Sequence, residues 1–195
     1  MKLLLTAFEP FGGEILNPAQ EVAMLIEQRG VKTVFLPVEY DKARDIAVKE
    51  IKSFRPDIVV SLGQAGGREG ISIEKYAVNK RRASIPDNGM RLISIEEPIE
   101  PGAPERCECA FDVDAVVDTV KAMGYPCYAS ESAGTFICNE VFYGCCRVHP
   151  RAVFVHLPFS TEQAARHEGA FTMRPADMAD AVKMILDSLR EQTYA

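Results

Sequence analysis

Short apolar runs rich in β-branched residues alternate along the chain with longer segments of helical periodicity. Such alternation is typical of a doubly wound α/β domain, in which helices cover both faces of a mostly parallel sheet. Several runs are almost entirely apolar, as expected of strands that are buried on both faces. The predicted strands are residues 2–6, 32–37, 57–63, 71–78, 127–130 and 152–157.

The segments between these strands carry the apolar faces of helices. Asn17 and Pro18 form the N-cap and first-turn pair of the first helix. The faces comprise Val22, Ala23 and Ile26; Ala43, Ile46, Ala47, Ile51 and Phe54; Val113, Val116, Val117, Val120 and Met123; and Met178, Ala181, Val182, Ile185, Leu186 and Leu189. No repeat or linker interrupts the pattern, which predicts one α/β domain over residues 1–195.

Two long irregular segments remain, residues 6–18 and 79–108. Long loops in a compact domain are more often functional than accidental. Ligands of open α/β sheets bind at the carboxyl ends of the strands, and the first segment leaves such an end. We therefore expect the site at this edge of the sheet.

Charge and composition exclude several classes of protein. The chain has 22 basic and 28 acidic residues, a net charge of −6, and no basic run longer than residues 80–82, so nucleic acid is not an expected partner. The apolar run at the N-terminus is too short for a signal peptide, and no segment approaches membrane-spanning length. We expect a cytoplasmic protein whose six cysteines are free thiols.

Cys138 is the candidate nucleophile. It follows the small-residue turn of residues 132–136 and begins a segment of helical periodicity, and a helix N-terminus lowers the pKa of a thiol. The alternative is an ordinary buried cysteine, which is the commoner role of a free cysteine. Position alone does not choose between them.

Three histidines are available as the base that cysteine catalysis requires. His149 precedes Pro150 at the expected end of a helix, where it serves as a C-terminal charge, and His167 lies in a polar stretch and is expected to be exposed. His156 ends an apolar strand, where sites of this fold class are built. A core histidine is the alternative for His156, which nevertheless is the best candidate base.

The third member of such a site is a carboxylate or an amide. Glu74 is unusual because it lies within a predicted strand, although a solvent-facing residue of an edge strand explains it equally well. A metal site is not expected, because residues 107–109 and 145–149 lack the two-residue spacing of a structural zinc site. The glycine-rich residues 63–70 follow a strand but lack the spacing of phosphate-binding motifs.

A set of motifs in order along almost the whole chain resembles pyroglutamyl peptidase I, the family of pyrrolidone-carboxyl peptidases. The motifs are FEPFGG (8–13), NP (17–18), ISIEKYAVN (71–79), IPDN (85–88), EPIEPGAP (97–104), SAGTFICN (132–139) and VFVHLPF (153–159). The resemblance implies a phosphorylase- or hydrolase-like α/β domain and a cysteine peptidase of the cytosol that removes N-terminal pyroglutamate from peptides. It also implies a homotetramer and no metal or organic cofactor.

Matched motif by motif, the resemblance implies a catalytic triad of Glu74, Cys138 and His156. It further implies that the ring of pyroglutamate is held by apolar side chains, that the backbone of Gln64 bonds the lactam and that Asn17 braces the phenylalanine loop. The implied apolar contacts are Phe8, Phe11, Ile85, Phe136 and Ile137. A neutral lactam suits such a pocket better than a charged clamp.

The chain departs from the family pattern at two positions. Ala7 stands where the family usually has glycine. Ser84 stands where the family usually has an arginine, and the resemblance implies that this arginine assists the oxyanion. Arg81 or Arg82 is a candidate to compensate for Ser84. Two alternative functions stay open: a catalytically silent protein that binds pyroglutamyl ends, and a phosphate-dependent transferase acting on a nucleoside or sugar.

Overall fold

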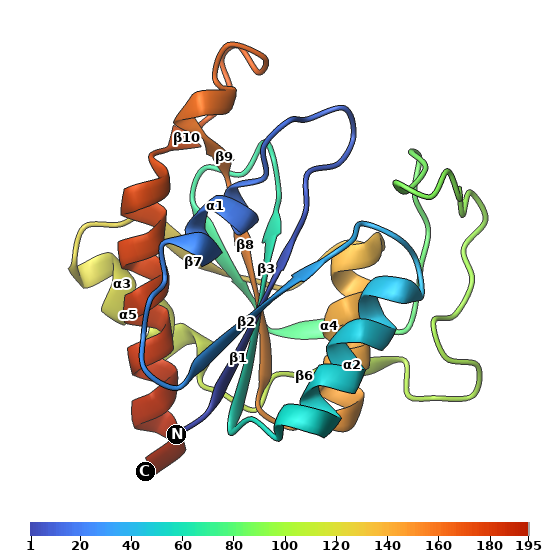
Figure 1. Ribbon diagram of the computed structural model, residues 1–195, viewed down its shortest axis with the longest axis horizontal. Coiled ribbons are helices and arrows are strands. Elements are labelled where there is room, and N and C mark those ends of the chain that lie inside the picture. Colours follow the sequence, from blue (N-terminus) through green and yellow to red (C-terminus); the bar gives the residue numbers. More distant parts are fainter. Residues whose placement is uncertain (195) are drawn as a thin grey trace.

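The computed structural model describes residues 1–194, which form a twisted central sheet of six strands between two layers of helices (Figure 1). The strand order is β2-β1-β3-β8-β4-β7. All neighbouring strands are parallel except β4 and β8, which are antiparallel. The strands are β1 Leu3–Phe8, β2 Val31–Leu36, β3 Ile58–Gln64, β4 Ile71–Glu74, β7 Cys127–Ser130 and β8 Ala152–Leu157. The predicted α/β class with a mostly parallel sheet is confirmed.

Helices α1, α3 and α5 cover one face of the sheet, and α2 and α4 cover the other (Figure 1). Successive side chains of β1 point to opposite faces of the sheet. Leu3 and Leu5 therefore pack under α1, α3 and α5, whereas Leu4 packs under α2 and α4. The helices are α1 Pro18–Met24, α2 Lys42–Phe54, α3 Val113–Ala122, α4 Ile137–Val148 and α5 Pro175–Tyr194.

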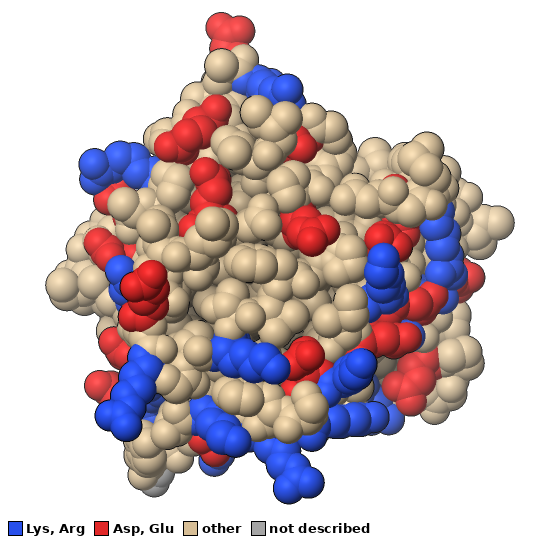
Figure 2. All heavy atoms as spheres, viewed as in Figure 1, with Lys and Arg blue, Asp and Glu red and all other residues tan. Residues whose placement is uncertain are grey.

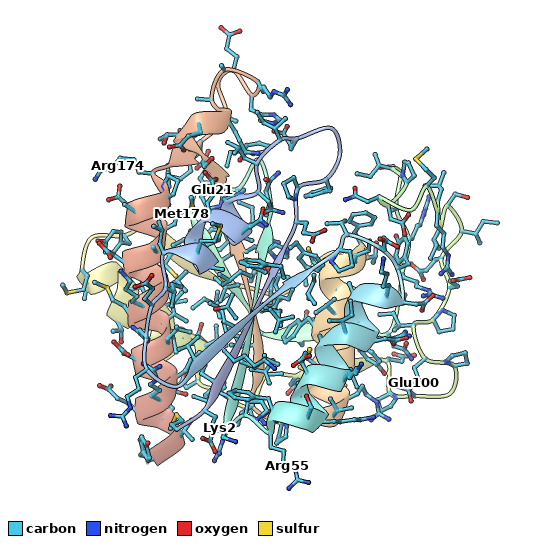
Figure 3. All side chains as sticks on the ribbon, in the orientation of Figure 1. Lys2, Glu21, Arg55, Glu100, Arg174 and Met178 are labelled. Atoms are coloured by element: carbon cyan, nitrogen blue, oxygen red, sulfur yellow. The ribbon has the colours of Figure 1, made fainter. Side chains whose placement is uncertain are left out.

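Helix α5 shows how the sequence pattern directs this packing. Met178 is fully buried and points inward from α5, whereas Arg174, just before the helix, projects into solvent (Figure 3). The apolar stripe that begins at Met178 is therefore the face that contacts the sheet and α1.

The prediction of one strand over residues 71–78 is wrong. The strand breaks at Lys75, and its second half, β5 Tyr76–Val78, leaves the main sheet to pair with β6 Arg106–Glu108. The backbone explains the break, because the Lys75 N–H donates to Ser130 O at 2.8 Å while the Lys75 carbonyl accepts from Cys109 N at 2.8 Å. The other five predicted strands are confirmed to within two residues at either end.

Three short elements were not predicted: η1 Thr161–Gln163 and the paired strands β9 Phe159–Ser160 and β10 Thr172–Met173. Each helix in the described residues 1–194 is too short or too polar to span a bilayer. Figure 2 shows acidic and basic side chains mostly around the edge of one face of the molecule, with uncharged residues over much of its centre.

Candidate active site

Helix α4 places Cys138 at its N-terminus. The thiol belongs to the second residue of the helix, after the extended N-cap Phe136 and a turn in which Gly134 has a φ of 77°. Gly63 of β3 leaves room for the sulfur, because a Cβ there would lie 3.0 Å from Cys138 Sγ and 2.8 Å from the Phe154 ring. The thiol is thus fitted against the carboxyl end of β3.

Glu74 and His156 form a buried pair on adjacent strands. His156 Nδ1 lies 2.8 Å from Glu74 Oε1, and both side chains are almost completely buried. An ionised carboxylate only accepts hydrogen bonds, so the imidazole proton is on Nδ1 and Nε2 is left as a base. The alternative of a solvent-facing Glu74 on an edge strand is wrong, because β7 and not β4 is the edge.

Burial and the hydrogen bond between Glu74 and His156 determine the protonation states of the two side chains. Burial lowers the pKa of His156 and outweighs the hydrogen bond with Glu74, which raises it. For Glu74, burial would raise the pKa, but the hydrogen bond and charge of His156 and the charge of Arg68 outweigh burial and hold it below its usual value. At neutral pH the site therefore contains a neutral imidazole beside an ionised carboxylate.

The thiol is protonated at rest. The position of Cys138 at a helix N-terminus predicts a lowered thiol pKa, but burial dominates and raises the pKa to about 12, with the charge of Glu74 adding to the increase. A base that takes the proton during attack is therefore needed, rather than a preformed thiolate.

Cys138 and His156 line the same open pocket, which has a volume of about 410 Å³. Glu74 lies behind His156, away from the opening. The structure thus brings the three predicted triad residues together. The remaining walls are Phe11, Gln64, Ala65, Arg68, Ser132, Ala133, Gly134, Thr135 and Phe136.

A small enclosed cavity adjoins the thiol and contains most of the predicted ring contacts. It is lined by Phe8, Phe11, Asn17, Val38, Gln64, Phe136, Ile137 and Cys138. The rings of Phe11 and Phe136 lie 6.2 Å apart. Ile85 is the exception among the predicted contacts, because it is 44% exposed and lines a neighbouring groove instead.

Side-chain amides hold the walls of this cavity. Asn17 Nδ2 donates to the carbonyl of Glu9 at 2.9 Å, in the loop that carries Phe11, while Asn17 Oδ1 caps α1. Gln64 Oε1 accepts a hydrogen bond from the buried Gln163 at 3.1 Å. The loop after β1 and the end of β3 are therefore tied to fixed elements.

The loop that contains Ser84 does not bring an arginine to the thiol. Ser84 and Arg82 are exposed and line the neighbouring groove with Ile85. Arg81 is only 11% exposed and lies 2.8 Å from both Asp41 and Glu140 and 2.9 Å from Glu97. Arg81 is thus already engaged by three carboxylates.

The other two histidines lie outside this pocket. His149 ends α4 as expected, with Nε2 3.0 Å from the carbonyl of Pro56. The expectation that His167 is exposed is wrong, because its ring stacks on Phe159 with centroids 3.7 Å apart and its Nε2 lies 2.8 Å from Glu14 Oε1. Its partner Glu14 is distant in sequence, which is why the local pattern did not show it.

Arg68, Val38 and Ala65 line the site but were not predicted. Val38 gave no signal beyond an apolar residue after a strand. Arg68 and Ala65 belong to the glycine-rich segment 63–70, which the sequence marked only as a weak phosphate loop. The glycines have a packing reason, because a side chain at Gly66 would overlap the Phe159 ring and Gly67 has a φ of 85°.

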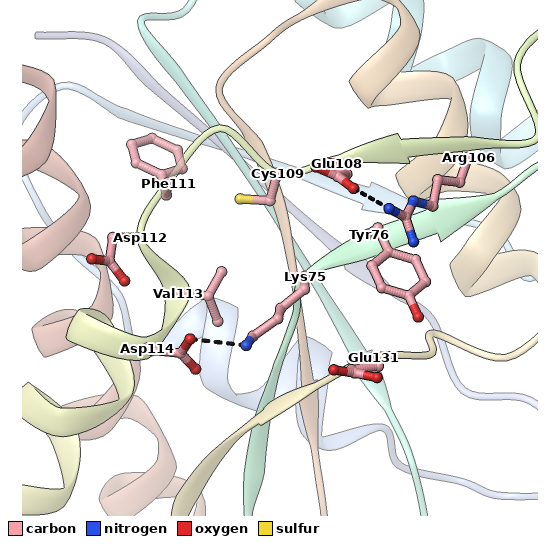
Figure 4. A pocket seen from close by; sticks show the side chains of 10 residues that line it. All are labelled: Lys75, Tyr76, Arg106, Glu108, Cys109, Phe111, Asp112, Val113, Asp114 and Glu131. Atoms are coloured by element: carbon pink, nitrogen blue, oxygen red, sulfur yellow. Dashed lines mark hydrogen bonds and ion pairs between the residues drawn. The ribbon is translucent and has the colours of Figure 1, made fainter.

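A second hollow, of about 430 Å³, contains Cys109 but is not lined by a histidine among the described residues (Figure 4). Its two basic side chains are paired, with Lys75 2.8 Å from Asp114 and Arg106 2.5 Å from Glu108. Burial raises the pKa of Cys109 to about 11. Within residues 1–194 no group of three His, Cys, Asp or Glu side chains is arranged to hold a metal ion.

Comparisons with known proteins agree on one family. The family model described as pyroglutamyl peptidase matches residues 1–192. The chain is 39% identical to the pyrrolidone-carboxylate peptidase of Chromobacterium violaceum, over 95% of this chain and 90% of the relative. It is 36% identical to pyrrolidone-carboxylate peptidase 1 of Caldanaerobacter subterraneus, over 94% of this chain and 95% of the relative.

A solved structure of pyrrolidone carboxyl peptidase from Pyrococcus furiosus superposes with a TM-score of 0.92 at 34% sequence identity. The match covers 99% of this chain and 100% of that one. Sequence and structure thus agree over the whole length, and the chain belongs to the pyroglutamyl peptidase family.

Proposed function

We propose that the protein is a cysteine peptidase that removes N-terminal pyroglutamate from peptides, with Cys138 as nucleophile, His156 as base and Glu74 as the residue that orients the base. One observation carries the assignment. The buried pair of Glu74 and His156, 2.8 Å apart, leaves one imidazole nitrogen as a base in the pocket that contains the Cys138 thiol. The other two histidines are held elsewhere, His149 against the carbonyl of Pro56 and His167 against Glu14.

The reaction is an acyl transfer in two steps. Cys138 Sγ attacks the carbonyl that joins pyroglutamate to the next residue while its proton passes to His156, and the imidazolium then protonates the leaving amine as the C–N bond breaks. Water, deprotonated by His156, hydrolyses the thioester and regenerates the thiol. Glu74 keeps the imidazole in the required tautomer and stabilises its charged form.

The N-terminus of α4 supplies a donor for the oxyanion. The backbone N–H of Cys138 lies in the first turn, where an amide has no acceptor within the helix, and it also lowers the pKa of its own thiol. Such a donor stabilises the negative charge that develops on the carbonyl oxygen. Because Arg81 is engaged by Asp41, Glu97 and Glu140, we do not propose it as a replacement for the missing arginine at position 84.

We propose that the lactam ring occupies the enclosed cavity beside the thiol. The cavity has a volume of only about 10 Å³, roughly that of one water, so its walls have to move apart when the ring enters. Apolar walls with a few polar partners suit a neutral ring. Phe8, Phe11, Phe136 and Ile137 then contact the ring, the backbone of Gln64 bonds it, Asn17 braces the loop, and Ile85 contacts the substrate from the neighbouring groove.

Release of a fluorophore from a pyroglutamyl amide tests this function, with the prolyl amide as a matched control that has the ring but not the lactam carbonyl. We expect phosphate-independent release from the pyroglutamyl amide only. Binding without release would identify a silent binding protein, and release that requires phosphate would identify a transferase; either result contradicts the proposal.

We further propose that the enzyme works in the cytoplasm as a homotetramer, without nucleic-acid partners. All six cysteines, which lie within the described residues, are free, which suits a reducing compartment. The tetramer rests on the family resemblance, and light scattering of the purified protein tests it.

A further inference from the structure

Few positive charges are placed to act on the thiol of Cys138. Arg81 is held by three carboxylates, and Arg82 lines the neighbouring groove with Ser84. Arg68, in the loop between β3 and β4, is the one cationic side chain within residues 1–194 that lines the pocket of Cys138 and His156.

The contacts of Arg68 join the elements that carry the proposed catalytic groups. Its Nη1 donates to Glu74 Oε1 at 2.6 Å and to the hydroxyl of Ser72, a β4 residue that pairs in register with His156. Its Nη2 donates to the carbonyl of Ser132 at 3.0 Å, in the turn that leads into α4. Glu74 Oε1 therefore accepts hydrogen bonds from both His156 and Arg68, whereas Oε2 has no hydrogen-bond partner among the described residues.

These contacts place a positive charge beside Glu74, whose negative charge has opposite effects on His156 and on Cys138. A buried carboxylate is needed to orient the imidazole, but its negative charge opposes negative charge on the nearby sulfur and raises the pKa of Cys138. The guanidinium of Arg68 acts in the opposite direction on Cys138 and also favours the ionised form of Glu74. One side chain thus offsets the unfavourable effect of Glu74 on the thiol while it keeps Glu74 ionised, although its charge also lowers the pKa of His156.

We infer that Arg68 is a positioning residue of the reaction, which holds Glu74 Oε1 against His156 and supplies the positive charge that supports the developing thiolate of Cys138. The inference rests on the proposed function only for the identity of the reaction. The planar guanidinium is required, because it reaches Glu74 and Ser132 at once through two nitrogens.

Alkylation of Cys138 by iodoacetamide, followed by mass spectrometry of the Cys138 peptide at pH 8, tests the effect on the thiol. The charges that act on Cys138 are those of Glu74 from β4 and Arg68, and the neutral imidazole of His156 shares its pocket. Arg68 also lowers the pKa values of Glu74 and His156, so the thiol is measured by itself through alkylation. Arg68→Gln is expected to slow alkylation about tenfold, since losing the nearby positive charge raises the thiol pKa and so lowers the fraction of thiolate. Arg174→Gln, which removes an exposed arginine before α5, is the matched control and leaves the rate unchanged.

Turnover of a pyroglutamyl amide gives the second measurement. We expect Arg68→Gln to lower kcat about 30- to 100-fold with KM within about threefold, because Arg68 acts on bond making and not on the ring pocket. Arg68→Lys keeps the positive charge but loses the planar guanidinium with its two donor nitrogens. We therefore expect this variant to be alkylated at the wild-type rate but to recover only part of the wild-type kcat. Should the wild type release no fluorophore, the proposed function fails, while alkylation still tests Arg68.

A folded Arg68→Gln protein that is alkylated at the wild-type rate overturns the inference. If circular dichroism shows this variant unfolded, Glu74→Gln is compared with the double variant Glu74→Gln/Arg68→Gln, in which no buried carboxylate is left unpaired. The inference then predicts alkylation about tenfold slower in the double variant than in Glu74→Gln. Equal rates in the two proteins overturn it.

Discussion

Two glutamate–histidine pairs within residues 1–194 have the same distance between the carboxylate oxygen and the imidazole nitrogen. His156 Nδ1 lies 2.8 Å from Glu74 Oε1, and His167 Nε2 lies 2.8 Å from Glu14 Oε1. Each glutamate also has an arginine beside it: Arg68 at 2.6 Å from Glu74 and Arg166 at 3.9 Å from Glu14. Distance and composition alone do not distinguish the two pairs.

Their surroundings differ. The side chains of Glu74 and His156 are 0% and 4% exposed and adjoin a thiol, whereas those of Glu14 and His167 are 12% and 29% exposed and have a stacked Phe159 ring beside them. The second pair joins the loop after β1 to the segment after β9, far along the chain. A glutamate–histidine pair thus serves catalysis only where burial and a nucleophile accompany it, and elsewhere it fastens a loop.

Removing the two imidazoles is the strongest test of this contrast. We expect His156→Ala to lower kcat about 10³-fold, because the base that takes the thiol proton is lost, and His167→Ala to lower it less than about threefold. His149→Ala, at the far end of α4, is a second control with no expected loss. The measurement is kcat on a pyroglutamyl amide, and equal losses for His156 and His167 would remove the distinction.

Neutralising the two glutamates should give a smaller difference and a change in pH dependence. Glu74→Gln is expected to lower kcat about 10²-fold, because the imidazole remains but loses its orientation. Glu14→Gln should leave kcat within about threefold, since Glu14 does not adjoin the pocket of Cys138 in the described structure.

The pH profile of kcat/KM shows whether, and in which direction, each glutamate shifts the pKa of His156. His156 must be neutral to accept the thiol proton, and burial lowers its pKa, so the acid limb should lie below 6.5, the ordinary histidine value. Glu74 raises the pKa of His156, so Glu74→Gln should move the limb further toward acid. Glu14→Gln should not move it. A limb above 6.5 in the wild type, or a shift toward alkaline pH in Glu74→Gln, would contradict the assignment of His156 as base.

The smallest effects are expected from the loop itself. Phe11→Ala should raise KM for pyroglutamyl substrates more than it lowers kcat, because it removes contact area that ground and transition states share. Glu14→Gln should raise KM by roughly two- to fivefold, since the loop carrying Phe11 is held less firmly. A fall in kcat for Glu14→Gln as large as that for Glu74→Gln would make the second pair part of the chemistry.

Local patterns were sufficient for much of the fold. The apolar runs of β3 and β8 and the N-cap pair before α1 were visible in the sequence, because burial on two faces and helix capping each select residue types locally. The rule that sites form at strand ends then singled out His156. Glu74 was chosen over other acidic residues through the family resemblance.

What depends on distant partners was not predictable. The break at Lys75 depends on the Ser130 carbonyl and the Cys109 amide, and both halves of residues 71–78 read equally well as strand. Arg68 gave no sign of contact with Glu74, and His167 gave none of contact with Glu14. The high thiol pKa of Cys138 follows from burial, which only the packed structure reveals.

Turnover of a pyroglutamyl amide by Cys138→Ser and Cys146→Ser tests the central claim most directly. Both cysteines belong to α4, but the Cys146 thiol contacts the Ala152 carbonyl and lies outside the pocket of His156. We predict that Cys138→Ser lowers kcat at least about 10³-fold with the fold intact, because a hydroxyl is a far weaker nucleophile here, and that Cys146→Ser keeps kcat within about twofold. Full activity of folded Cys138→Ser, or an equal loss in both variants, would contradict the assignment of Cys138 as the nucleophile.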